Sequence, residues 1–196
     1  EVPVRGEGRL RPSIYVPRPV RDADFLVSCP KFKTHPWTGV TFALKNWIGI
    51  QDDAHRLIDH DFRLDEKIVD LHDAVRPSLC LIDGIVGGTG RMLTPDPVDL
   101  GLVIGGADPV AVDATCCRIL GRDPAGIDHI RMAAERGLGT MDERSIDLRG
   151  DVSLEEARRR GACFGEARIP VEQFFAPTPL SAYSGPPPDP GRSDYC

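Results

Sequence analysis

The sequence predicts an α/β fold with a mainly parallel sheet and helices on both faces. Short apolar segments bounded by glycine and proline alternate along the chain with segments of helical periodicity. The apolar segments are hydrophobic throughout, as is typical of parallel strands buried on both faces. We expect residues 1–175 to form this domain, with a sheet incomplete on its N-terminal side. Residues 176–196, of which six are proline, are expected to form a linker or disordered tail.

The first half of the chain carries two of the expected strands and two of the expected helices. A strand at 25–29 is a short apolar run that a proline ends, and a second buried strand spans 79–86. Between them we expect a loop at 31–39 and a helix at 40–48. A further helix at 64–75 has apolar residues at helical spacing and a proline just beyond its end.

The second half of the chain is punctuated by glycine, proline and N-cap signals. A glycine-rich loop at 84–90 leads to a third strand at 100–105. An aspartate followed by proline, with a glycine later, predicts a helix at 109–120 and a second one at 123–137. The remaining expected elements are a short strand at 146–148 and a helix at 153–161 that opens with a capping box.

The composition excludes several classes of protein. A formal net charge of −6 and a pI of about 5.4 argue against nucleic acid as the main partner, because that role needs a broad basic face. No apolar run approaches the roughly 20 residues that cross a bilayer, so no membrane span is expected. Six cysteines without a CxxC pair or a signal peptide predict reduced thiols and a cytoplasmic location.

Lysine usage indicates one local basic site. Only four of the 24 basic residues are lysine, and three of them, Lys31, Lys33 and Lys45, fall within 15 positions. No acidic residue lies between Phe25 and Gln51, so these ammonium groups are not neutralised locally. The cluster follows a strand, where α/β proteins bind ligands. We expect a site for a small anionic substrate or cofactor; the alternative is a solvated basic loop that pairs with acids elsewhere in the fold.

His35 lies among these lysines and is expected to act as a general acid or base, with a reference pKa of about 6.5. The predicted catalytic residues are His35, Lys33 and Asp113, and we expect Asp83 and Asp113 to orient the lysines. Asp113 falls in the apolar arc of its helix and must be paired; the alternative is that it binds backbone amides or an arginine. The predicted substrate-binding residues are Lys31, Thr34, Thr38, Lys45, Asn46, Asp83 and Asp108, the last of which is also explained as an N-cap.

Two residues are candidate metal ligands. Cys29 ends a strand beside two lysines, which should lower its pKa, but a small buried thiol that finishes a strand is the more ordinary interpretation. His60 belongs to a segment of mixed carboxylates and imidazoles at 52–61, whose irregular spacing suits a divalent ion or a solvated loop. His72 and His129 are expected to be ordinary helix residues.

Four motifs, in order and spacing, resemble those of the domain-of-unknown-function 362 family and cover roughly residues 20–140. They are the run from Cys29 to His35, the stretch from Gly39 to Gly49, the segment from Val75 to Gly84 and the block from Gly106 to Ala114. Where relatives carry Glu-Gly-x-Gly-Pro, residues 87–91 are Gly-Gly-Thr-Gly-Arg. The glutamate carboxylate of the relatives is therefore missing here, together with any role that depends on it.

The resemblance implies that the chain is a fragment of a longer member. Such members have a further α/β portion before this domain and a ferredoxin-like iron–sulfur segment after it, which would place a [4Fe–4S] cluster beyond Cys196. The resulting hypothesis is an enzyme domain that acts on a small anionic molecule, by iron–sulfur-linked redox chemistry or by proton transfer next to a carboxylate. The alternatives are a non-catalytic anion-binding or iron–sulfur accessory module, and motifs that serve inter-domain packing. No nucleic acid or membrane partner is expected.

Overall fold

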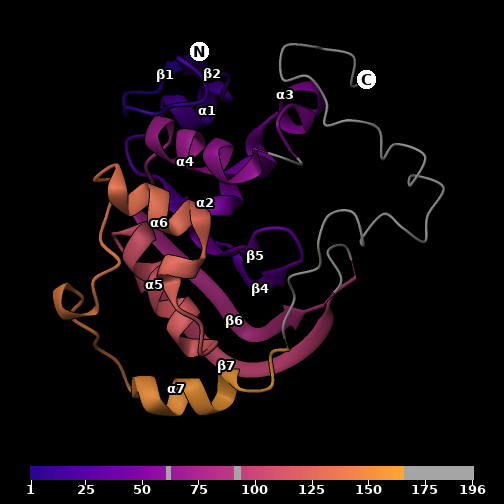
Figure 1. Cartoon of the computed structure of the whole chain (residues 1–196), viewed down its shortest axis with the longest axis vertical. Helices are drawn as coiled ribbons and strands as arrows, with labels where there is room; N and C mark the ends of the chain where they lie inside the picture. The colour runs from indigo at the N-terminus through magenta and orange to yellow at the C-terminus, as the bar shows by residue number, and fades with distance from the viewer. Residues whose placement is uncertain (61–62, 91–93, 166–196) are drawn as a thin grey trace.

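The structure is a computed structural model that describes residues 1–60, 63–90 and 94–165. Its main sheet runs in the order β3, β6, β4 and β5, with β7 also paired to β6. Figure 1 labels β4 to β7 of this sheet. The strands span Val27–Ser28 (β3), Lys31–His35 (β4), Gly39–Val40 (β5), Leu79–Thr89 (β6) and Asp96–Gly106 (β7). A separate two-stranded sheet joins β1 (Val2–Pro3) to β2 (Ser13–Ile14).

The α/β class is confirmed, and β6 is the strand around which the main sheet forms. The strands β3 and β4 both pair with β6 in parallel, with Val27 opposite Leu79 and Lys31 opposite Asp83. The other two pairs are antiparallel, β7 with β6 and β5 with β4. The sheet is therefore parallel at its centre, and antiparallel pairing extends it on both sides.

The glycine-rich segment 84–90, predicted as a loop, is mostly the second half of β6. Its glycines allow neighbours to pack directly on the strand. A Cβ added at Gly87 would lie 2.5 Å from the ring of Phe164, and one added at Gly84 would lie 3.0 Å from the carbonyl oxygen of Leu102. Close packing, not turn formation, accounts for these glycines.

The predicted helices at 64–75 and 109–120 are confirmed as α4 (Leu64–Ala74) and α5 (Pro109–Ile119). Asp108 caps α5 by accepting hydrogen bonds from the amides of Val110 and Ala111. The remaining α-helices are α1 (Arg18–Arg21), α2 (Phe42–Asn46), α3 (Asp53–Leu57), α6 (Asp128–Glu135) and α7 (Leu154–Gly161), and the 3-10 helices are η1 (Trp47–Ile50), η2 (Pro124–Gly126) and η3 (Glu143–Ser145).

Several predicted boundaries differ from the structure. The predicted loop at 31–39 contains β4, whose polar sequence concealed a strand. The predicted helix at 40–48 is the short α2 continued by η1, and the one at 123–137 is η2 followed by α6. No strand forms at 146–148. These departures occur where tertiary contacts override local preference.

The two faces of the β6 and β7 hairpin differ in their exposure. One face of this hairpin packs on the core through residues such as Ile82 and Leu100, which contribute to a single buried cluster with α2, α4, α5 and α6. Leu81, Ile85 and Val103 point the other way and are exposed, Val103 by 64%.

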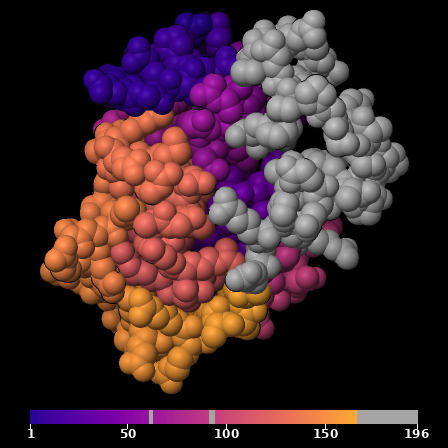
Figure 2. All heavy atoms as spheres, viewed as in Figure 1, coloured from indigo at the N-terminus to yellow at the C-terminus, as the bar shows by residue number. Residues whose placement is uncertain are grey.

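The N-terminal segment is attached to α4 by buried carboxylates. Asp70 accepts hydrogen bonds from the amides of Leu10 and Arg11, and Asp73 accepts them from Arg5 and Gly6. These bonds satisfy backbone groups that have no strand partner there. Figure 2 shows the resulting arrangement, with the N-terminal residues in indigo at one end of the molecule and α7 at the other.

Candidate functional site

A group of basic side chains lies where the end of β4 approaches α2. Its members are Lys33 and His35 on β4, Lys45 on α2, and His60 just after α3. Their charges act on one another, because Lys45, Lys33 and His60 each lower the pKa of His35. We call these four residues the basic cluster.

His35 is held in one protonation form by its backbone neighbours. The amides of Trp37 and Thr38 donate hydrogen bonds to its Nδ1, at 3.2 and 3.3 Å. Because a backbone amide can only donate, Nδ1 is the unprotonated nitrogen and Nε2 carries the hydrogen. His35 is 1% exposed, and its Nε2 has no hydrogen-bond partner among the described residues. The ring therefore presents a fixed, unsatisfied N–H donor.

The environment of His35 keeps it neutral. Burial, followed by repulsion from Lys45 and Lys33, lowers its pKa to about 2. The expected role as a general acid or base of ordinary pKa does not fit this position, since the Nδ1 lone pair is occupied and a neutral N–H is a very weak acid. The geometry suits a neutral donor that hydrogen-bonds to an anion.

Lys45 carries the least satisfied charge of the cluster. Its ammonium has neither a hydrogen bond nor an ion pair in the described part of the chain. Burial, followed by repulsion from Lys33, lowers the pKa of Lys45 to about 8, and attraction to Asp65 opposes this. Burial also lowers the pKa of Lys33. An ammonium has three hydrogens to donate, so Lys45 leaves room for an acceptor from outside the protein.

Trp37 joins the two histidines of the cluster. Its ring meets those of His35 and His60 edge-on, with centroids 5.7 and 5.9 Å away. The Nδ1 of His60 lies 3.1 Å from the carbonyl oxygen of Arg56, which can only accept, so the lone pair of this imidazole is on Nε2. Burial, followed by repulsion from Lys45, lowers the pKa of His60 to about 4. The cluster thus combines one N–H donor with one neutral nitrogen acceptor.

A histidine–aspartate pair that the sequence did not reveal borders the basic cluster. His129 on α6 lies fully buried, with its Nδ1 2.7 Å from a carboxylate oxygen of Asp65 on α4. Asp65 raises the pKa of Lys45 and His129 lowers that of His35, so the pair acts on the cluster electrostatically. The two residues are 64 positions apart, and each resembles an ordinary helix residue in its own segment. Only the tertiary fold identifies them.

Asp113 fixes the start of α2 and thereby the position of Lys45. Its two carboxyl oxygens accept hydrogen bonds from the amides of Ala43, at 2.8 Å, and Leu44, at 3.0 Å. Burial raises the pKa of Asp113 to about 8, against the effect of these two bonds. The preceding Phe42 has a φ of 39°, a left-handed conformation that is strained for a side chain of this size. Of the two roles weighed for Asp113, the structure shows contact with backbone amides and none with a lysine.

Three predicted binding residues make hydrogen bonds within the protein. The partners are Thr89 for Thr34, the carbonyl of Val40 for Thr38, and Ser28 for Asn46. Thr34 and Thr38 belong to the strand and turn that carry His35, and Asn46 follows Lys45 on α2. These residues support the elements of the site.

The remaining predicted residues have other interactions or are exposed. Lys31 and Asp83 form an ion pair of 2.7 Å in which each side chain is about half exposed. Asp108 caps α5 and also accepts a hydrogen bond from the amide of Thr140. None of these three residues is among the charges that shift the pKa of Lys45. Cys29 is an exposed free thiol.

The described residues contain no group of three or more histidine, cysteine, aspartate or glutamate side chains that could hold a metal ion. The two candidate ligands, Cys29 and His60, are therefore not part of such a group there. Among the described helices, none combines the length and the apolar character needed to cross a membrane.

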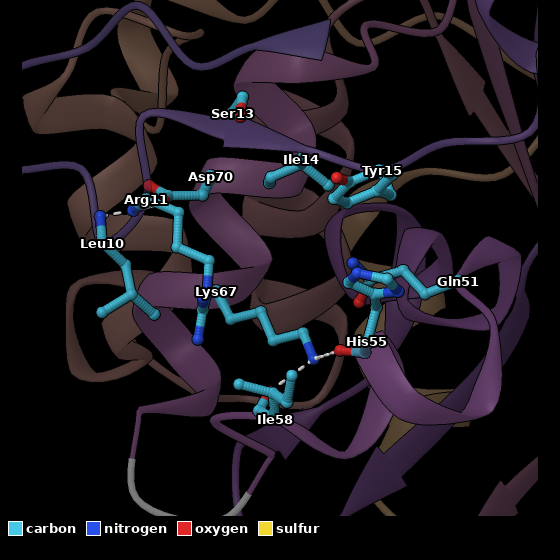
Figure 3. A pocket seen from close by; sticks show the side chains of 10 residues that line it. All are labelled: Leu10, Arg11, Ser13, Ile14, Tyr15, Gln51, His55, Ile58, Lys67 and Asp70. Carbon is cyan, nitrogen blue, oxygen red and sulfur yellow. Dashed lines mark hydrogen bonds between the residues drawn. The ribbon is translucent and has the colours of Figure 1, made fainter. Parts of the chain in front are cut away.

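A separate cavity of about 140 Å³ lies beside β2, α3 and α4 (Figure 3). Lys67 lines it and donates hydrogen bonds to the carbonyls of His55, Arg56 and Ile58, at 2.6, 2.8 and 2.6 Å, which closes the end of α3. Asp70, also in the lining, is bound to the N-terminal segment. Its buried charges already have partners, so the basic cluster is the better candidate for a ligand site.

Comparisons with known proteins identify one curated relative and one matching family. A curated relative, a thylakoid-associated protein of Synechocystis sp., is 32% identical over 125 residues, which are 60% of this chain and 38% of the relative. The chain thus spans about two fifths of the length of that relative. No solved structure matches significantly. The model of the family described as "Domain of unknown function (DUF362)" matches residues 1–118, more than half of the chain, and the chain therefore belongs to that family.

Proposed function

We propose that this chain binds a small anionic substrate at the basic cluster and forms the substrate-binding part of an enzyme. The observation that carries the proposal is the partly buried ammonium of Lys45, which has no partner in the described part of the chain and lies near enough to His35 to lower its pKa. The buried Nε2–H of His35 has no partner there either. Buried polar groups in folded proteins are nearly always satisfied. A bound phosphate, sulfate or carboxylate would accept from both.

The electrostatics support an anion of small size. Lys33 and Lys45 repel each other in a half-buried setting, which costs folding free energy that an anion between them would offset. His35 adds a donor that stays neutral and needs no proton to bind. Strongly shifted pKa values gathered at one place are typical of functional sites.

Replacing Lys45 by methionine is expected to weaken sulfate binding by about 10- to 100-fold, because one charge-assisted hydrogen bond is lost. Isothermal titration calorimetry with sodium sulfate measures this. The matched control is Lys31→Met, which removes an equal charge paired with Asp83 at the exposed sheet face and should change affinity less than about twofold. Equal losses in the two variants, or no sulfate binding by the unmodified chain, would contradict the proposal.

Sulfate affinity is expected to fall as the pH rises through about 8, the pKa of Lys45. Lys45 is protonated and able to bind the anion below that pH and neutral above it, so affinity should drop by about tenfold per pH unit on the alkaline side. Sulfate is a suitable probe because its own charge is constant in this range. Titrations across that range test this; an affinity that does not change until well above pH 8 would show that Lys45 is not the group that binds the anion.

One observation favours the alternative of a non-catalytic anion holder. His35 can donate a hydrogen bond but cannot accept a proton while the amides of Trp37 and Thr38 occupy Nδ1. Because the glutamine amide keeps an N–H donor, His35→Gln should retain most of the sulfate binding in either case. Only in an enzyme would the same variant also lose turnover.

The iron–sulfur segment and the ferredoxin-like partner proposed for longer family members would lie beyond this chain. The activity of the whole protein is part of this proposal as well. A reducing compartment is supported by the five described cysteines, all of them free thiols.

A further inference from the structure

This inference deepens the proposed function and rests on it. We propose that Lys45 forms an imine with its ligand, so that the substrate class is a carbonyl compound that also carries an anionic group. An α-oxo acid and a phosphorylated aldehyde both have this chemistry. The reactive atom is the Nζ of Lys45, and the anionic group is held by the rest of the basic cluster.

The four lysines of the chain differ in what their ammonium groups contact. Lys67 donates to three carbonyl oxygens within the protein, which leaves no hydrogen for a ligand. Lys31 is ion-paired with Asp83 at 2.7 Å. Lys45 alone of these three has neither kind of contact among the described residues, and its side chain is only partly covered. Its amine is therefore unengaged in the described part of the chain, on a residue that is not fully buried.

The surroundings of Lys45 favour the free amine that an imine requires. Burial and the neighbouring Lys33 lower its pKa to about 8, so roughly a tenth of the molecules carry the neutral amine at pH 7. Desolvation and a cationic neighbour are the two ways in which proteins activate a lysine nucleophile, and both operate here.

The reaction balances without any further reagent. The lone pair of Nζ attacks the carbonyl carbon, and the electrons of the C=O bond move to oxygen, which takes up a proton. The amine loses two protons, which leave together with the former carbonyl oxygen as one water molecule, and a C=N bond remains. The Nε2–H of His35 is suited to hydrogen-bond the ligand oxygen.

Pyridoxal 5′-phosphate is the probe that tests this, because it joins an aldehyde to a phosphate. The chain is incubated with it, reduced with sodium borohydride and digested, and the label on each lysine is quantified by mass spectrometry. We expect Lys45 to carry at least about tenfold more label than Lys31 or Lys67, which serve as controls within the same molecule. Excess sulfate should suppress the label on Lys45 only.

A second variant keeps the imine and the anion site distinguishable. Lys45→Arg retains the positive charge but has no amine to form an imine, so it should take up no label at this position and should still bind sulfate more tightly than Lys45→Met does. Sulfate binding with labelling that follows exposure, highest on Lys31, would overturn the imine and leave the anion site intact. Loss of both sulfate binding and Lys45 labelling in the unmodified chain would overturn both proposals.

Discussion

Replacing Asp113 by alanine is expected to lower the free energy of unfolding by about 3–5 kcal/mol. The carboxyl group is completely buried, and its oxygens are the acceptors for the amides of Ala43 and Leu44 at the start of α2. Alanine leaves both amides buried without a partner and adds a small cavity, and each orphaned amide costs about 1–3 kcal/mol. Urea denaturation followed by circular dichroism measures the change.

Two variants separate this role from a general effect of removing an aspartate. Asp113→Asn keeps one accepting oxygen and should cost about half as much. Asp123→Ala removes an N-cap from the exposed η2 and should cost about 1 kcal/mol. A loss at Asp113 no larger than that at Asp123 would show that the carboxyl group does not hold α2. Because α2 carries Lys45, the Asp113→Ala chain that remains folded should also bind sulfate less tightly.

The helical wheel identified Asp113 as a buried carboxyl because helical periodicity is a local property of the sequence. The wheel could not identify its partners, since Ala43 and Leu44 lie 70 and 69 residues away. Similarly, the lysine count predicted one basic site containing Lys31 and Lys45. In the structure these two residues have different interactions: Lys45 acts electrostatically on His35, whereas Lys31 forms an ion pair with Asp83 on the neighbouring strand.

The strand β4 shows why local sequence patterns predict part of the fold incorrectly. Its residues alternate, with Phe32 and Thr34 buried, but lysines between them make the segment polar on average. Pairing with β6 supplies the hydrogen bonds that make it a strand, and no local pattern reports that pairing. The glycines of β6 predict a loop when only the local sequence is considered. In the structure they leave room for Phe164 and Phe32, which lie far from them in the sequence.

The free energy of unfolding of the chain is expected to decrease between about pH 7.5 and about pH 4.5. Replacing His72 by leucine is expected to abolish about 2.5 kcal/mol of that decrease. His72 on α4 is 1% exposed, and neither ring nitrogen has a well-aligned hydrogen bond in the described part of the chain. Burial, followed by repulsion from Arg76, lowers its pKa to about 4, while Asp108, Asp73 and the backbone of Leu138 oppose this.

The direction of this pH effect follows from the lowered pKa. The unfolded chain takes up a proton on His72 below about pH 6.5, whereas the folded chain resists it down to about pH 4. The stabilisation is therefore complete above pH 6.5 and declines as the pH falls through that window. Leucine has a similar volume and cannot be protonated, so its variant should match or exceed the unmodified chain at pH 4.5. Urea unfolding midpoints of both proteins at pH 7.5 and pH 4.5 test this prediction. If the leucine variant keeps the full decrease in stability at low pH, other groups cause that decrease. His60, with its pKa of about 4, is then the first residue to replace.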